Sequence, residues 1–107
     1  MKLTEFNPRW VGAGGEGVYD KDHNPVPERH GVAVMLDCPC GCEHPLCVMF
    51  TNPIDGGAKI DGRNTWQRVG DTFETLTLTP SIQRIPINEG YCSWHGFITN
   101  GEIITCG

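Results

Sequence analysis

Short apolar runs separated by turn residues dominate the pattern of this chain. The first clear run, Val-Ala-Val-Met-Leu, lies within residues 31–37, and a second, Leu-Cys-Val-Met-Phe-Thr, fills residues 46–51. Short apolar runs that include β-branched residues are typical of buried strands. We predict that these two runs form a hairpin, and that residues 38–45 are its connection.

Further strand candidates follow in the second half of the chain. Trp66–Val69 and Phe73–Thr79 are predicted strands, and in the second of them leucines alternate with threonines, as on a strand with one solvated face. The apolar stretch 82–87 is interrupted by Pro86 and preceded by Pro80. Because proline cannot donate to a strand ladder, we expect an edge strand or a loop there.

The dipeptide Asn100-Gly101 separates two apolar runs at residues 96–99 and 102–105. Asn-Gly is the preferred two-residue turn of a β-hairpin, so these runs are predicted to pair. Counting outward from the turn places His95 opposite Cys106, and opposed side chains share one face of a sheet.

No stretch shows sustained helical periodicity and no internal repeat is visible. The pattern therefore predicts an all-β, single-domain fold: a small sheet, sandwich or barrel of short antiparallel strands with a cysteine-rich, zinc ribbon-like knuckle. Residues 1–30 are rich in glycine and other turn formers, and we expect an extended arm or ordered loop there. Residues 31–107 are then the metal-binding β domain.

Composition adds two constraints to this picture. With 107 residues, 14 glycines and 8 prolines, the chain buries only a modest core and would profit from a covalent or metal staple. A net charge of −5 with scattered basic residues disfavours nucleic-acid binding.

No apolar run follows Lys2, so neither a secretion signal nor a membrane span is expected, and the cytoplasm is the predicted location.

Cysteine placement provides the strongest chemical signal. Four of the six cysteines, Cys38, Cys40, Cys42 and Cys47, fall within ten residues. In a reducing compartment, clustered cysteines near a histidine indicate a metal site rather than disulfides. Cys92 and His95 have the two-residue spacing with which a tight turn directs two ligands at one ion.

These spacings predict a zinc ion. Its expected ligands are Cys38, Cys40, Cys92 and His95, and Cys42 and Cys106 are alternatives for one donor position. Cys47, inside a predicted strand, is expected to be a small buried hydrophobic residue. The other histidines, His23, His30 and His44, are expected to face solvent.

An iron–sulfur cluster is the alternative cofactor. The segments 42–47 and 92–96 resemble the two cluster-binding loops of Rieske proteins, which would make Cys42, His44, Cys92 and His95 the ligands of a two-iron two-sulfur cluster for electron transfer. That assignment leaves Cys38 and Cys40 without a role, so we favour zinc.

The ligand chemistry bears on function. A thiolate-rich set closes the coordination sphere of zinc, which indicates a structural metal with no catalytic residues in a protein-binding or regulatory module. The enzyme alternative is a metal-dependent hydrolase, in which water occupies one ligand position and Glu43 or Glu74 acts as the base.

Four segments, Phe6–Gly12, Asp37–Cys42, Thr72–Ile82 and Cys92–Phe97, together resemble a family of small uncharacterised proteins of bacteriophages and prophages. Members of that family are often labelled ammonia monooxygenase. The resemblance implies a phage-encoded, metal-bound β protein in the host cytoplasm, without an established activity. Separately, we expect a monomer or small homo-oligomer with a host or phage protein as its partner. A monooxygenase needs a redox metal with open positions or a flavin, and the sequence shows a motif for neither.

Overall fold

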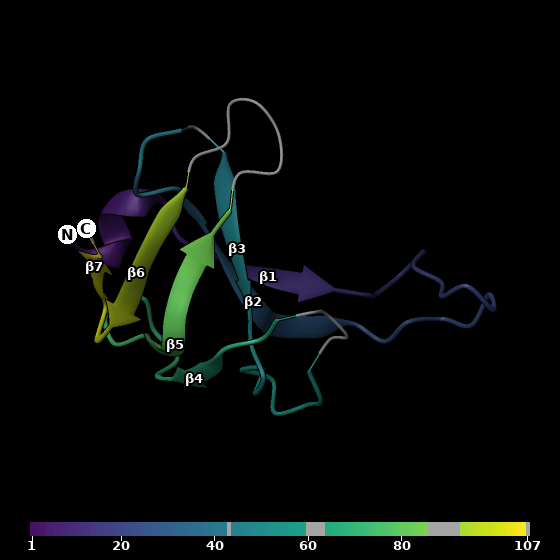
Figure 1. Ribbon diagram of the computed structural model, residues 1–107. Helices are drawn as coiled ribbons and strands as arrows, with labels where there is room; N and C mark the ends of the chain where they lie inside the picture. The colour runs from purple at the N-terminus through teal and green to yellow at the C-terminus, as the bar shows by residue number, and fades with distance from the viewer. Residues whose placement is uncertain (43, 60–63, 86–92, 107) are drawn as a thin grey trace.

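The computed structural model describes residues 1–42, 44–59, 64–85 and 93–106 (Figure 1). Within these ranges a short 3-10 helix precedes seven strands in two antiparallel sheets. The elements are η1 (Leu3–Phe6), β1 (Arg9–Ala13), β2 (Arg29–Asp37), β3 (Pro45–Met49), β4 (Gln67–Val69), β5 (Thr77–Arg84), β6 (Trp94–Thr99) and β7 (Glu102–Thr105). The sheet orders are β1-β2-β3 and β4-β5-β6-β7, so the predicted all-β fold is confirmed.

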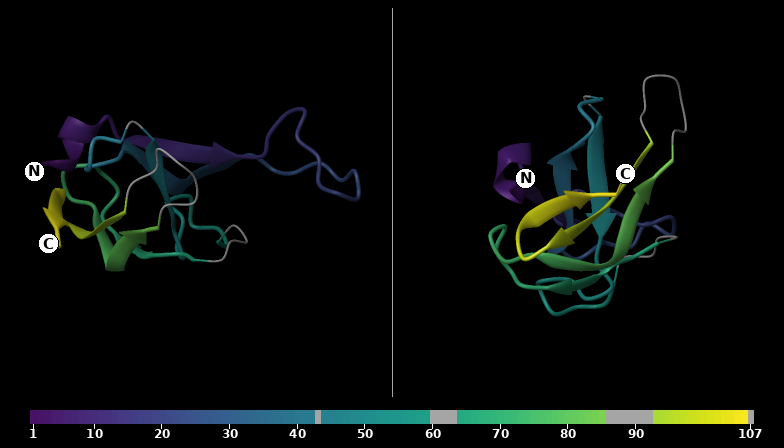
Figure 2. Two further views of the ribbon diagram at one scale, coloured as in Figure 1. Left: turned by 45° about the horizontal axis from the view of Figure 1, so that its top comes forward. Right: turned by 60° about the vertical axis from the view of Figure 1, so that its left-hand side comes forward.

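One hydrophobic core joins the two sheets. Figure 2 shows the two sheets in two further views. Its members come from alternating positions of strands in both sheets, as expected when each sheet buries one face. They include Val34 and Leu36 of β2, Leu46 and Val48 of β3, Leu78 and Ile82 of β5, Ile98 of β6 and Ile103 of β7. Phe50, just after β3, is fully buried among them.

The predicted hairpin around the cysteine cluster is confirmed. Strands β2 and β3 pair antiparallel with Leu36 opposite Leu46, and the segment between the strands is the predicted connection. Cys47 differs from expectation, because its side chain is exposed rather than buried. Side chains of a strand alternate between faces, and since Leu46 and Val48 point into the core, Cys47 points outward.

The C-terminal hairpin also has the predicted register. Thr99 lies opposite Glu102 and Gly96 opposite Thr105. Asn100 and Gly101 both have positive φ angles, of 47° and 74°, as the preferred two-residue turn requires.

The position of β5 corrects the prediction for residues 73–87. The strand begins at Thr77 instead of Phe73 and continues through Pro80 into a stretch expected to be an edge strand or loop. Pro80 is accommodated because the register between β5 and β6 shifts between Leu78 and Ile82, where a ladder bond is not needed. Residues 86–87 of that stretch lie outside the described residues.

The first thirty residues contain more regular structure than an arm. Both η1 and β1 fall within them, and β1 pairs with β2 so that Trp10 lies opposite Val34 and packs against the core. Residues 14–28 fit the prediction better, since they extend away from the two sheets as a long loop (Figure 1). The division into an arm and a domain at residue 30 stays a prediction.

Among the described residues there is no helix long and apolar enough to span a membrane.

Candidate functional site

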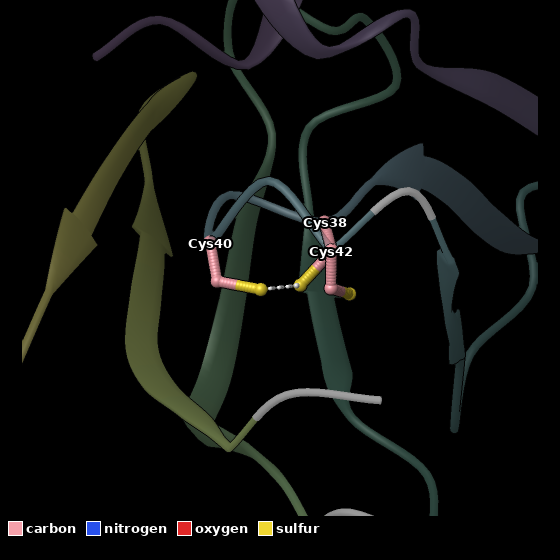
Figure 3. Close-up of side chains that lie close together, drawn as sticks. All are labelled: Cys38, Cys40 and Cys42. Atoms are coloured by element: carbon pink, nitrogen blue, oxygen red, sulfur yellow. Dashed lines mark hydrogen bonds between the residues drawn. The ribbon is translucent and has the colours of Figure 1, made fainter. Parts of the chain in front are cut away.

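Three cysteines lie together on the connection between β2 and β3 (Figure 3). The sulfur atoms of Cys38, Cys40 and Cys42 all lie within 4.8 Å of one another, and those of Cys38 and Cys40 are 3.3 Å apart. Gly41 makes this possible, because its φ of 83° closes a turn in which its N–H donates to the Cys38 carbonyl at 3.0 Å. The turn thus brings three sulfurs within 4.8 Å of one another.

The cluster has dimensions that suit a metal ion. Tetrahedral zinc holds thiolates at ~2.3 Å, which places ligand sulfurs ~3.8 Å apart, close to the observed spacing. Burial raises the pKa of the Cys38 thiol, and the nearby Arg84 charge opposes this in part. Cys40 is disulfide-bonded, so a metal would take up its sulfur only after reduction to the thiolate. The three cysteines could hold a metal ion, whose identity the sulfurs alone do not fix.

Arg84 connects this cluster to the second sheet. Its Nη1 donates to the carbonyl oxygens of His44 at 3.0 Å and Pro45 at 3.2 Å. Hydrogen bonds from a charged donor are among the stronger ones in proteins. The end of β5 is therefore fastened to the cysteine-bearing connection.

The remaining predicted ligands are placed differently. Cys92 lies outside the described residues. The His95 ring is directed at Ser81 rather than at the three sulfurs, and Cys106 meets His95 through its backbone N–H, 2.8 Å from the His95 carbonyl. The structure brings Cys42 to Cys38 and Cys40, whereas the full ligand set stays a prediction.

The other histidines are outside the three-sulfur group. The expectation of solvent exposure is confirmed for His23 and His30. His44 is half-buried instead of exposed, and its carbonyl accepts a hydrogen bond from Arg84.

A serine and a histidine form a second constellation that the sequence interpretation did not contain. The Ser81 Oγ and the His95 Nε2 are 2.9 Å apart, a hydrogen-bond distance. Ser81 lies on β5 and His95 on the neighbouring β6. In the ladder between these strands, Gln83 pairs with His95 and Ile82 pairs with Gly96. The chain contains only two serines, and Ser93, the other one, makes no hydrogen bond to a histidine in the described structure.

The backbone around Ser81 is held in place from two sides. Trp66 donates its indole N–H to the Ser81 carbonyl at 3.2 Å. On the other side β5 bulges, because it advances four residues from Leu78 to Ile82 while β6 covers only two, from Ile98 to Gly96. Bulges frequently lie next to active sites, where they redirect a side chain.

The pair has the geometry of an activated nucleophile. A serine hydroxyl attacks carbonyl carbon when an adjacent imidazole accepts its proton. In the described ranges no carboxylate is hydrogen-bonded to His95, so the arrangement is a dyad there. The sequence alone did not reveal it because the two residues are fourteen positions apart and meet only through the register of β5 and β6.

The cavities lie elsewhere on the molecule. One of about 300 Å³ is bounded by β1, β2 and the loop after β3, and its lining includes Trp10, His30 and Asp55. Asp55 is occupied by Arg29, whose Nε lies 2.7 Å from its carboxylate and holds the pKa of that carboxyl well below its ordinary range. Neither Ser81 nor His95 lines this cavity, and on their sheet Ser81 is half-buried and His95 exposed.

Glu43 and Glu74 are the alternative bases of the metal-dependent hydrolase hypothesis. Glu74 lines a separate cavity with Lys2 and Glu102 at the turn of the C-terminal hairpin. Glu43 lies outside the described residues.

Comparison with known families gives one match. A family model described as BubE, bacterial ubiquitination-like system serine protease, matches residues 17–106, a span that includes Ser81, His95 and the cysteine cluster. No curated protein and no solved structure matches the chain. The match gives no evidence for the phage family that the sequence resembles or for the ammonia monooxygenase label.

Proposed function

Because the chain belongs to the BubE family of bacterial ubiquitination-like system serine proteases, we propose that it is a serine hydrolase with Ser81 as nucleophile and His95 as general base. The observation that carries this proposal is the 2.9 Å hydrogen bond between Ser81 Oγ and His95 Nε2. A serine protease requires a serine next to a base. Of the two serines in the chain, Ser81 has that neighbour.

The reaction follows from this geometry. Ser81 Oγ attacks the substrate carbonyl carbon while His95 Nε2 accepts the hydroxyl proton. As the bond to the leaving group breaks, His95 donates that proton to the departing amine or alcohol, and an acyl ester remains on Ser81. A water molecule then gives a proton to His95 and attacks the ester, and His95 returns that proton to Ser81 Oγ as the carboxylic acid leaves.

Solvent exposure of the pair favours a protein as substrate. A small molecule is normally enclosed by a pocket, whereas neither Ser81 nor His95 lines either of the two cavities described above. A protein substrate supplies the missing wall itself. Given the family description, we assign as substrate the C-terminal tail of a ubiquitin-like protein of the same bacterial system, and we place the reaction in the bacterial cytoplasm.

A fluorophosphonate probe tests the nucleophile directly. This reagent phosphonylates activated serines, so we expect one covalent adduct per chain, located on Ser81 by peptide mass spectrometry. His95→Gln should abolish labelling because the hydroxyl loses its base. Ser93→Ala is the matched control and should be labelled like the wild type.

An adduct on Ser93, or a folded wild-type protein that takes up no probe, would contradict this assignment. Labelling that persists in His95→Gln would remove the histidine from the proposed role.

We propose further that the cysteine cluster binds a structural zinc ion through Cys38, Cys40 and Cys42. The supporting observation is the set of three sulfurs within 4.8 Å of one another on a turn that Arg84 links to the second sheet. Zinc held by thiolates contributes folding energy, which suits a small glycine-rich chain. Catalysis in this proposal belongs to the serine and histidine, and the metal stabilises the connection between β2 and β3.

Metal analysis of protein purified under reducing conditions should find one zinc per chain. Cys38→Ser should lose the stoichiometric metal and lower the melting temperature by about 10 °C or more, because a structural site supplies several kcal/mol. Cys47→Ser is the control, since Cys47 is exposed on β3 away from the three-sulfur group, and it should keep its zinc. Full zinc content in Cys38→Ser would exclude the cluster, and two irons with labile sulfide would identify the Rieske-like alternative.

A further inference from the structure

Two large apolar side chains are exposed on the sheet face that carries the proposed nucleophile. Along β6, Trp94, Gly96 and Ile98 point inward while His95 and Phe97 point outward. Phe97 lies opposite Ile104 of β7, so their side chains share the outer face. Phe97 is 38% exposed and Ile104 is 50% exposed, which leaves an adjacent apolar pair in contact with water.

The strand register lines this pair up with Ser81. Between the pairs Leu78–Ile98 and Ile82–Gly96, β5 has three residues, the last of which is Ser81, whereas β6 has only Phe97. Ser81 therefore neighbours Phe97 across the irregular part of the β5–β6 ladder, and Phe97 lies opposite Ile104 on β7. Neighbouring strands are ~4.8 Å apart, which places the apolar pair roughly 5–10 Å from the nucleophile.

The ring of His95 bounds the same surface. Its centroid lies 6.3 Å from that of Phe97, and its Nε2 is at the Ser81 hydroxyl. A substrate whose carbonyl reaches Ser81 must therefore lie over or beside Phe97. An exposed apolar pair that adjoins a reactive group is an interaction site more often than a scattered surface residue is.

We infer that Phe97 and Ile104 form a specificity-determining subsite, which binds an apolar side chain two or three residues from the scissile bond of an extended peptide. The residue count follows from the distance, since an extended chain advances ~3.3 Å per residue. This inference rests on the proposed serine hydrolase function and adds the substrate class to it. The occupant is a peptide segment with Leu, Ile, Val or Phe at that position.

A peptide mixture with varied residues around each potential cut site tests the subsite. Cleavage products of the wild type, identified by mass spectrometry, should favour an apolar residue over serine by about tenfold or more at a position two or three residues from the cut. In the double variant Phe97→Ser and Ile104→Ser this preference ratio should fall to about one to three. A ratio measured within one variant does not depend on how much active protein the sample contains.

Val69→Ser is the matched control, because Val69 is an exposed apolar residue on β4 at the opposite edge of the same sheet. This control should keep the wild-type preference. A wild type without the preference, or a folded double variant that retains it, overturns the subsite.

Hydrolysis of a small activated ester by the wild type, abolished by Ser81→Ala, tests the hydrolase function separately from the subsite. Ester turnover without apolar preference leaves the hydrolase standing and rejects the subsite. Absence of ester turnover by the folded wild type rejects the hydrolase, and the subsite with it.

Discussion

Ser81→Ala is expected to lower kcat/KM for an activated ester by at least about 10³-fold while the melting temperature stays within about 2 °C of the wild type. The reason is that the hydroxyl forms the acyl ester, and no neighbouring group replaces it. The side chain is half-buried on the outer face of β5 and contributes no large apolar surface, so its loss leaves the core intact. Steady-state kinetics and thermal unfolding on the same samples measure both quantities.

The companion variant His95→Gln should lose about 10²–10⁴-fold, the usual contribution of a general base. Because the two groups act as a unit, the double variant should be no worse than Ser81→Ala alone. Ser93→Ala and His30→Gln, which change an exposed serine and an exposed histidine elsewhere, serve as controls and should keep wild-type kinetics. Comparable activity in Ser81→Ala, or multiplicative losses in the double variant, would contradict a Ser81–His95 dyad.

Phe50→Ala is expected to have the largest effect on folding. Phe50 is fully buried, its ring meets Trp10 edge-on with centroids 6.2 Å apart, and the Arg68 guanidinium lies 5.8 Å from its centroid. Removing a buried phenyl ring costs about 3–5 kcal/mol through lost transfer energy and the cavity left behind. In a domain of this size the melting temperature should fall by about 15 °C or more.

Val69→Ala provides the control for this measurement, because Val69 is exposed on an edge strand and should change stability by less than about 0.5 kcal/mol. Chemical denaturation with reducing agent present measures the free energy of unfolding for both variants. A Phe50→Ala protein as stable as the wild type would mean that the two sheets do not share the core described here.

The hairpins could be predicted from sequence because their information is local. Asn100-Gly101 specifies both a turn and a register, and every counted pair from Gly96–Thr105 to Thr99–Glu102 is present in the structure. The β2–β3 pair follows in the same way from two apolar runs with a short connection. In each case the turn residues and the apolar pattern agree.

The start of β5 and the site on it depend on non-local contacts. Pro80 argued against a strand, yet the bulge there removes the need for its N–H. Cys92-x-x-His95 has the spacing of metal ligands, while the position of the His95 ring depends on which residue of β5 lies beside it. The register between β5 and β6 is set across the long connection from Arg84 to Trp94, and no turn motif specifies it.

The cysteine cluster falls between these cases. Proximity of Cys38, Cys40 and Cys42 follows from their spacing on one turn, and the structure brings the three sulfurs together. Whether Cys42 ranks below Cys38 and Cys40 as a metal ligand could not be predicted, because it depends on how Gly41 closes the turn. Spacing identifies candidate donors, and backbone conformation selects among them.

The bulge in β5 has one more consequence, which concerns how such a site can arise. It adds two residues to β5, an even number, and side chains alternate with a period of two. Leu78 before the bulge and Ile82 after it consequently both still point inward, opposite Ile98 and Gly96. A sheet can thus gain or lose this insertion, and with it the outward placement of Ser81, without exchanging a core residue. The fold can therefore be inherited without the activity.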